Sequence, residues 1–285
     1  MERCIDLQLT EEFININMNF RNHRKIVVID NNVGFVGGFN VGDEYLGKDS
    51  KFGYWRDTHI KFTGSAVNDL NLRFLADWRY ATKEEVSLEE IFEANEENSN
   101  SNNVGMQIVS SGPNLSDKYE IKMAYLKMIQ KAKKYIYIQT PYLLPTEPIL
   151  MALKTAALAG VDVRIMIPAR ADTWITHLGS LSYLDDIMRA GVRIYLYQKG
   201  FLHSKLMVSD DTLSTVGSTN MDFRSFEHNF EVNAFMYDPS SALLLKGIFL
   251  QDQKDAILLQ RKTWIKRPWY QKAQESIVRL LAPLL

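Results

Sequence analysis

Apolar and polar positions follow two alternating patterns between residues 118 and 197. Stretches with apolar residues at helical spacing are each followed by a short apolar run rich in Val, Ile and Tyr, and this pair occurs three times. The pattern predicts helices at residues 118–134, 147–160 and 172–191, and strands at residues 135–139, 161–167 and 192–197. Such alternation is typical of an α/β fold whose sheet is largely buried.

An internal repeat is the second feature of the chain. Residues 23–40 (HRKIVVIDNNVGFVGGFN) align without a gap to residues 203–220 (HSKLMVSDDTLSTVGSTN). Each copy predicts a strand, a turn at Asn31 or Asp211, and a second strand that ends in small residues. The polar run at residues 95–103 between the copies predicts a linker, so we expect one lobe at residues 1–103 and a second at residues 104–285.

Composition narrows the class of protein. The 285 residues are 46 % hydrophobic and 24 % charged, which is typical of a folded globular chain, and 33 Lys and Arg oppose 34 Asp and Glu. A net charge of −1 provides no general attraction for nucleic acid, so no nucleic-acid partner is expected. The lone Cys4 favours a reducing compartment, and no secretory signal or membrane-spanning stretch is expected.

The repeat carries a pair of His and Lys residues in each copy. His23 and Lys25, like His203 and Lys205, are two positions apart on an extended segment and therefore point to one face. Two such pairs suit a single phosphodiester: one imidazole attacks phosphorus, the other protonates the leaving oxygen, and the ammonium groups hold the nonbridging oxygens. The small-residue turns supply further candidate phosphate donors, namely Asn40, Asn220 and Ser218.

A carboxylate follows each copy on a further predicted strand. Asp57 lies in WRDTHIKF and Glu231 lies in NFEVNAFMY. A carboxylate bonded to one imidazole nitrogen fixes the tautomer, so we predict that these two residues orient the histidines. The alternative is a buried ion pair with Arg56 or Arg224.

The metal alternative is weak. Lys is not a metal ligand at neutral pH, and the motif lacks the additional Cys or His residues of zinc sites. We therefore expect no metal and no cofactor. Asp30 and Asp210 end the first strand of each copy, where Asp commonly bonds its own backbone in a turn.

The two motifs resemble the HxKxxxxD motif that occurs twice per active site in the phospholipase D superfamily, at His23-Lys25-Asp30 and again at His203-Lys205-Asp210. Stretches such as YIQTPYLLP and GSTNMDFRSFEHNFEVNAF are similar to the bacterial cardiolipin synthases within it. The resemblance implies an α/β fold of two pseudo-twofold lobes with mixed sheets flanked by helices. It places all six motif residues in the catalytic set, with His23 as nucleophile and His203 as acid and base.

The same resemblance implies a substrate and a location. It implies that phosphatidylglycerol is both donor and acceptor, with an anionic membrane surface as partner at the cytoplasmic face of the cell membrane. Against that family pattern, we expect the first lobe to be incomplete at its N-terminal side and the membrane anchor to be absent from the chain.

Other functions stay open at this stage. The same chemistry serves lipid hydrolases, phosphatidylserine synthases and nucleases, and an inactive lipid-binding fragment is a further alternative. Residues 263–285 mix aromatic and basic side chains, which suits either a bilayer interface or a terminal helix packed on the sheet. The sequence makes no prediction of the oligomeric state.

Overall fold

A mixed sheet forms the centre of the molecule. The computed structural model describes residues 20–51, 53–84, 104–113, 119–170 and 172–282. Within them the larger sheet has the order β15-β9-β8-β6-β11-β12-β14-β5, in which β6, β8 and β9 are parallel and the other pairs antiparallel. The strands are β5 (Met106–Ser111), β6 (Tyr135–Gln139), β8 (Asp162–Pro168), β9 (Arg193–Tyr197), β11 (Leu206–Ser209), β12 (Leu213–Gly217), β14 (Glu231–Met236) and β15 (Ala256–Leu258). The expected α/β class with mixed sheets is confirmed.

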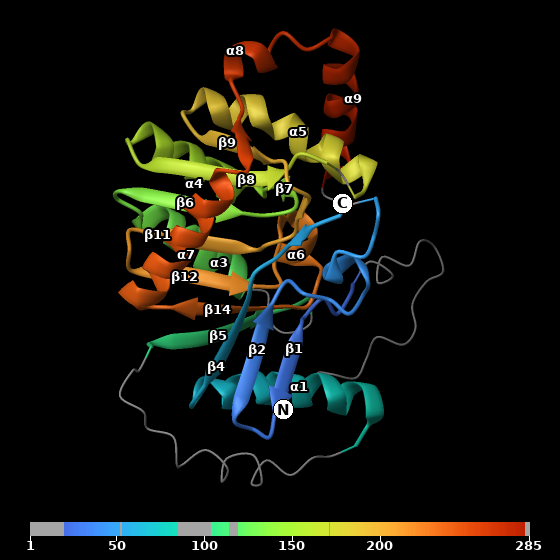
Figure 1. Cartoon of the computed structure of the whole chain (residues 1–285), viewed down its shortest axis with the longest axis vertical. Coiled ribbons are helices and arrows are strands. Elements are labelled where there is room, and N and C mark those ends of the chain that lie inside the picture. Colours follow the sequence, from blue (N-terminus) through green and yellow to red (C-terminus); the bar gives the residue numbers. More distant parts are fainter. Residues whose placement is uncertain (1–19, 52, 85–103, 114–118, 171, 283–285) are drawn as a thin grey trace.

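Helices cover both faces of this sheet (Figure 1). On one face α3 (Glu120–Lys131), α4 (Glu147–Leu158) and α5 (Trp174–Arg189) pack on residues such as Ile136 and Ile138. On the other, α7 (Pro239–Gln253) packs on Tyr135 and Tyr137. Because both faces of β6 are buried, its sequence is a continuous apolar run rather than an alternating one. The three expected helix and strand pairs are present, and none of their ends is shifted by more than three residues.

The first copy of the repeat forms a smaller sheet, β1-β2-β4, made of β1 (Ile26–Ile29), β2 (Val33–Gly37) and β4 (His59–Thr63). Ile26 pairs with Val36 just as Leu206 pairs with Val216 in the second copy. Apolar side chains of this sheet and of α1 (Ala66–Thr82) pack on Val232 of β14 and its neighbours, so the two sheets share a core. Figure 1 shows the small sheet, in blue, lying against β14 and β5.

Short parallel pairings cross between the copies. β3 (Trp55–Arg56) pairs with β10 (Phe201–Leu202), and His203 N then donates to Arg56 O at 2.7 Å. At the related position Asn22 bridges to Phe230, and His23 N donates to Phe230 O at 2.9 Å. The backbone of each motif histidine is therefore held by the segment just before Asp57 or Glu231 of the other copy.

The remaining elements surround this junction and extend to the C-terminal side. They are η2 (Glu44–Leu46), β7 (Leu143–Leu144), β13 (Met221–Asp222), α6 (Phe223–Glu227), α8 (Arg261–Trp264) and α9 (Trp269–Leu280). No helix in the described ranges combines the length and apolarity needed to cross a bilayer. Cys4 and the predicted linker at residues 95–103, with the lobe boundary that it defines, lie outside the described residues.

Candidate active site

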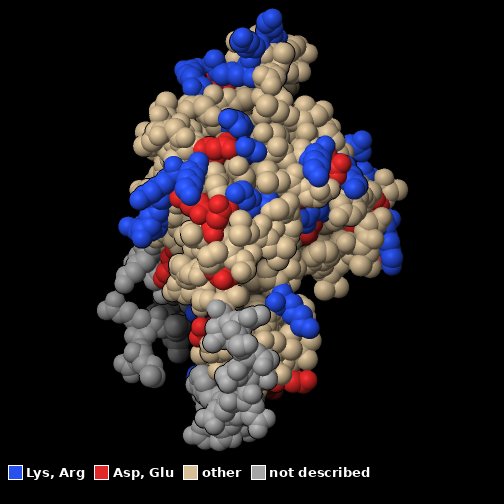
Figure 2. Space-filling view, turned by 60° about the vertical axis from the view of Figure 1, so that its left-hand side comes forward, with Lys and Arg blue, Asp and Glu red and all other residues tan. Residues whose placement is uncertain are grey.

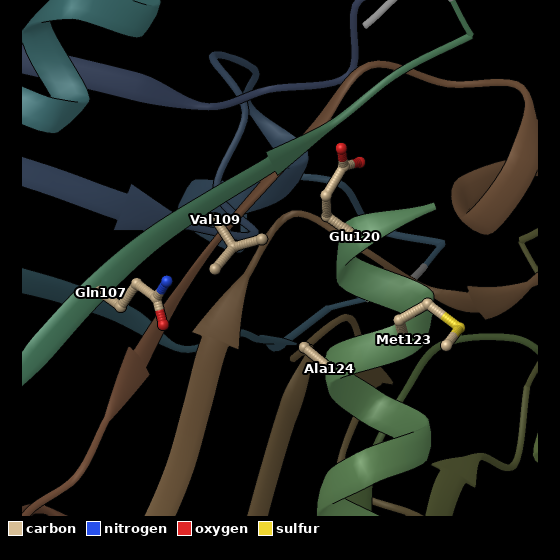
Figure 3. Close-up of a pocket in the computed structure, with 5 residues that line it drawn as sticks. All are labelled: Gln107, Val109, Glu120, Met123 and Ala124. Atoms are coloured by element: carbon tan, nitrogen blue, oxygen red, sulfur yellow. The ribbon is translucent and has the colours of Figure 1, made fainter. Parts of the chain in front are cut away.

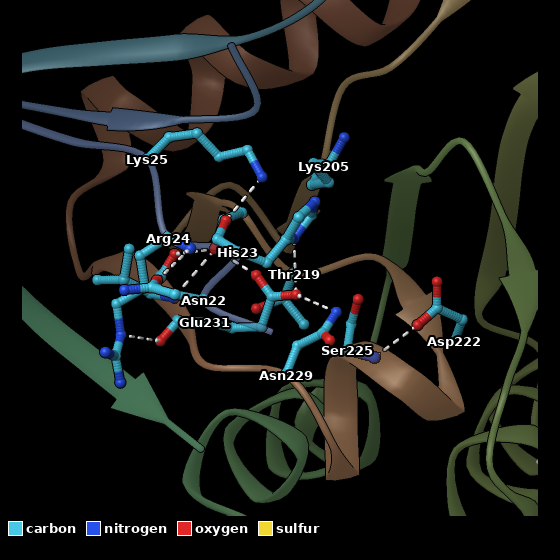
Figure 4. A network of polar contacts seen from close by, with 12 residues as sticks. Asn22, His23, Arg24, Lys25, Lys205, Thr219, Asp222, Ser225, Asn229 and Glu231 are labelled. Atoms are coloured by element: carbon cyan, nitrogen blue, oxygen red, sulfur yellow. Dashed lines mark hydrogen bonds and ion pairs between the residues drawn. The ribbon is translucent and has the colours of Figure 1, made fainter. Parts of the chain in front are cut away.

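Each motif histidine is bonded to the carboxylate of the other copy. His23 Nδ1 lies 2.8 Å from Glu231 Oε1, and His203 Nδ1 lies 2.7 Å from Asp57 Oδ2. Both carboxylates are fully buried. Because an ionised carboxylate only accepts hydrogen bonds, each Nδ1 donates, and each Nε2 carries the free lone pair when the ring is neutral. Figure 4 shows the His23 half of this arrangement.

The expected orienting role of the two carboxylates therefore has a specific geometry, which the chain order alone does not reveal. Arg56 does not form the alternative ion pair with the Asp57 carboxylate, because its side chain binds Asp252 at 2.8 Å. The Arg56 guanidinium does donate to the backbone oxygen of Asp57, which fixes the backbone but leaves the carboxylate for His203.

Two buried lysines lie beside the histidines. Lys25 Nζ donates to His23 O at 2.6 Å, and Lys205 Nζ donates to His203 O at 2.5 Å. Burial lowers the pKa of Lys25 to about 8 and that of Lys205 to about 7, while Glu231 and Asp57 oppose the shift in both. Because both carboxylates act on both ammonium groups, the two motifs form one electrostatic cluster.

The two imidazoles differ in accessibility. The side chain of His23 is 27 % exposed, whereas that of His203 is 8 % exposed. Burial, followed by the charge of Lys205, lowers the pKa of His203 to about 3. His203 is thus neutral near pH 7, and His23 is the ring that an incoming molecule reaches more easily.

Aromatic rings enclose His203. The centroids of the Tyr45, Trp55 and Phe201 rings lie 5.6, 5.4 and 6.1 Å from its own. These rings contribute to the burial that, together with the charge of Lys205, lowers the pKa of His203. Sequence reasoning missed Tyr45 and Trp55, because neither belongs to a repeated motif.

The residues predicted to bind phosphate have three different environments. Asn40 is exposed, and its Nδ2 donates to Tyr45 Oη at 2.5 Å. Asn220 is buried, and its Oδ1 has no hydrogen-bond partner within the described residues. The Ser218 hydroxyl donates to Glu231 Oε2 and accepts from Val232 N at 3.0 Å. The Ser218 hydroxyl therefore holds the Glu231 carboxylate, and its role in phosphate binding stays a prediction.

Gly38 is the first-copy counterpart of Ser218. A Cβ atom placed there would lie 2.3 Å from Asp57 Oδ1 and 2.6 Å from Oδ2. The carboxylate of Asp57 therefore occupies the space that the Ser218 side chain fills in the second copy. Glycine is required at this position by the close approach of Asp57.

Asp30 and Asp210 lie at hairpin turns rather than beside the histidines, and their place in the catalytic set stays a prediction. Both have positive φ, 49° and 54°, at the turn that follows β1 or β11, whereas the histidines precede those strands. Asp210 accepts from the backbone N atoms of Lys133, Lys134 and Tyr135 at 2.7 to 2.9 Å. Its role is to join the hairpin turn to the start of β6, in line with the turn chemistry expected of Asp.

Two supporting residues were not found from sequence. Arg24 Nη1 pairs with Asp77 at 2.6 Å and its Nε donates to the backbone oxygen of Glu231 at 3.3 Å. Asn229 Nδ2 lies 3.4 Å from Glu231 Oε1. Burial alone would raise the pKa of Glu231, but His23, Lys25 and Ser218 outweigh it and lower that pKa.

A separate hollow lies between β5 and the start of α3 (Figure 3). Its lining is mainly aliphatic and includes Val109, Met123 and Ala124, with no motif residue among them. It therefore contributes nothing to the histidine cluster. No group of three or more His, Cys, Asp or Glu side chains in the described part of the chain is arranged to hold a metal ion.

Comparison with known proteins adds the following. Residues 125–253 match the family described as cardiolipin synthase, PLD-like domain. The chain is 46 % identical over 277 residues to a cardiolipin synthase of Clostridium perfringens, covering 96 % of this chain and 58 % of that protein. It is 49 % identical over 273 residues to cardiolipin synthase 2 of Staphylococcus epidermidis, covering 95 % and 55 %. The chain thus spans little more than half the length of these curated relatives.

A solved structure gives the fold comparison. A phosphatidylserine synthase from Haemophilus influenzae superimposes with a TM-score of 0.68 at 16 % sequence identity, covering 93 % of this chain and 71 % of that one. At this identity the likeness concerns the fold alone. The fold in which the two repeat copies pack together is therefore one that a solved structure already shows.

Proposed function

Because the chain belongs to the phospholipase D superfamily, we propose that it acts as a cardiolipin synthase, which joins two phosphatidylglycerol molecules and releases glycerol. The observation that carries the proposal is the crossed pair of histidine and carboxylate contacts, with Lys25 and Lys205 beside them. This arrangement supplies two imidazoles with free Nε2 atoms around one cationic centre, which is what a two-step transfer at phosphorus requires.

In the first step His23 Nε2 attacks the phosphorus of one phosphatidylglycerol. A P–N bond forms, the P–O bond to the glycerol headgroup breaks, and His203 gives a proton to the leaving oxygen. Glu231 accepts from Nδ1 of His23 and stabilises the positive ring that results. The greater exposure of His23 supports its role as nucleophile, because a lipid phosphate is bulky.

His203 must carry a proton for that step. Burial and the charge of Lys205 lower its pKa. A bound phosphodiester carries negative charge between the two lysines, so it opposes the effect of Lys205 and favours the protonated ring. Asp57 at 2.7 Å holds the ring in the required orientation.

In the second step the terminal hydroxyl of another phosphatidylglycerol gives its proton to His203. The hydroxyl oxygen attacks phosphorus, the P–N bond breaks, and His23 is regenerated with cardiolipin as product. Lys25 and Lys205 contact the nonbridging oxygens in both steps and stabilise the added charge. The proposed location is the cytoplasmic face of the cell membrane, where an anionic surface supplies both substrates.

The test uses the purified chain, phosphatidylglycerol vesicles and mass spectrometry of the products. Cardiolipin and glycerol are expected from the wild type, and neither from His23→Ala or His203→Ala. His177→Ala is the matched control, since His177 on α5 lies outside the cluster, and it should keep wild-type turnover. Phosphatidic acid in place of cardiolipin would make the chain a hydrolase, and no product from a folded wild type would refute the proposal.

The roles of the two histidines are separated by a second substrate. The phosphatidyl ester of p-nitrophenol has a leaving group that departs without a proton. With this ester, His203→Ala should recover release of nitrophenol and accumulate a phosphatidyl adduct on His23, while His23→Ala should stay inactive. Recovery in His23→Ala instead would reverse the two assignments.

A further inference from the structure

The helix α9 exposes several large apolar side chains, whereas one of the two residues that it buries, Glu275, is acidic. Trp269 and Leu280 are each 80 % exposed and Ile277 is 63 % exposed, whereas Glu275 is 5 % exposed. Helical spacing places Trp269, Ile277 and Leu280 on one face, with Tyr270 beside them. An ordinary surface helix instead turns its apolar stripe toward the core.

Polar contacts attach the buried side of α9 to the rest of the molecule. Arg267 binds Glu275 through two contacts of 2.6 and 2.9 Å, and Arg279 Nη1 donates to Ser182 O on α5 at 3.3 Å. Val278 is buried against α5. Figure 1 shows α9 at the upper end of the molecule beside α5. Val278 and these polar contacts together fix the orientation of α9 on the molecule.

The segment that carries this face is rich in basic residues, although Asp185 and Asp186 on α5 pair with its Arg261 and Arg279. Between residues 261 and 282 the one acidic residue is Glu275, which is paired with Arg267. Lys262, Lys266 and Lys272 are exposed in the same segment. Figure 2 shows Lys and Arg side chains gathered at the upper end of the molecule. Because the whole chain has a net charge of −1, this excess of basic side chains is a local feature of the segment.

We propose that the exposed face of α9, with the lysines that flank it, is the surface by which this protein binds an anionic lipid bilayer. Aromatic side chains at the start of the helix suit the headgroup level, aliphatic ones insert below it, and lysines attract the lipid phosphates. The choice of an anionic lipid rests on the proposed function, whereas the apolar face and its basic border stand on the structure alone. α9 therefore holds the molecule on the surface that contains its substrate.

The test is flotation of the full chain with vesicles, which needs no turnover. Wild type should float with phosphatidylglycerol vesicles and less with phosphatidylcholine vesicles. The triple variant Trp269→Ser, Ile277→Ser, Leu280→Ser should lower the partition coefficient by about 10- to 100-fold. Lys262→Glu with Lys266→Glu should weaken binding to phosphatidylglycerol vesicles selectively, and added salt should reduce that difference.

Matched controls use other exposed leucines. Leu158, Leu243 and Leu244 are 73, 52 and 66 % exposed on α4 and α7, and their change to Ser should leave vesicle binding unchanged. Equal flotation of the α9 triple variant and the wild type would overturn the proposal, as would loss of binding in the control alone.

Turnover of a short-chain, monomeric phosphatidylglycerol separates the two proposals. An α9 variant that keeps this activity and loses activity on vesicles supports the docking surface. A wild type that floats but turns over neither substrate refutes the proposed function and leaves the surface standing.

Discussion

Replacement of Gly38 by Ala tests the crossed histidine and carboxylate pairs most directly. The new Cβ would lie 2.3 and 2.6 Å from the two oxygens of Asp57, which is closer than real Cβ contacts allow. The backbone at Gly38 is not left-handed, so Ala adds no backbone strain there and the conflict is with the Asp57 carboxylate. Relief of the contact requires the Asp57 carboxylate to move, and that movement breaks its 2.7 Å bond to His203.

The magnitude follows from that bond. A hydrogen bond to a charged group contributes about 1.5 to 3 kcal/mol. If that stabilisation is lost in the transition state, kcat falls by about 10- to 150-fold at 1.36 kcal/mol per decade. Overpacking of a buried site also costs about 1 to 3 kcal/mol of folding free energy, so the variant is expected to melt earlier but to fold.

The assay is kcat and KM for phosphatidylglycerol at a temperature well below the melting transition. The expected loss lies in kcat, because Asp57 acts on the imidazole rather than on the substrate. Gly247→Ala is the matched control: no atom lies within 4 Å of its Cβ position, so turnover should be unchanged. A Gly38→Ala protein with wild-type kcat would show that the contact between Asp57 and His203 is not needed for turnover.

Three further outcomes are expected. Ser218→Ala removes the hydroxyl donor from Glu231, so kcat should fall by about 10-fold with an unchanged KM, and an equal rise in KM would point to phosphate binding instead. Burial lowers the pKa of Lys25 to about 8 and that of Lys205 to about 7, so both ammonium groups are fully charged only below those pH values. Because this charge attracts the phosphate, kcat/KM should fall as the pH rises through that range. A flat pH profile there would contradict this reasoning. Asp210→Ala leaves three backbone N–H groups without their acceptor, so chemical denaturation should show about 1 to 3 kcal/mol lower stability with unchanged kcat in the folded protein.

Local features of the fold were readable from the sequence because they repeat. The hairpins at residues 23–40 and 203–220 have the same spacing, and the structure gives them the same register. Helix and strand periods between residues 118 and 197 located three pairs of elements for a similar reason. In each case a short stretch of chain contains all the information that sets the element.

Partnerships across the molecule were not readable. The predicted strand that follows each copy located Asp57 and Glu231, yet nothing in a linear repeat states which carboxylate reaches which ring. Tyr45 escaped notice because its contact with His203 joins segments far apart in the chain. The β5 strand also escaped, since it is recognised by its pairing with β14 rather than by its own pattern.

The crossed contacts make the site a property of both copies at once. His203 takes its backbone partner from Arg56 and its carboxylate from Asp57, while Glu231 belongs to the copy that contains His203 and serves His23. The two carboxylates are not interchangeable, because that of Asp57 fills the space where a Cβ of residue 38 would lie, whereas the longer Glu231 is held by a serine hydroxyl at the equivalent position. Proton transfer therefore depends on the docking of the two sheets, and a substitution in the shared core that shifts one sheet should disturb both imidazoles together.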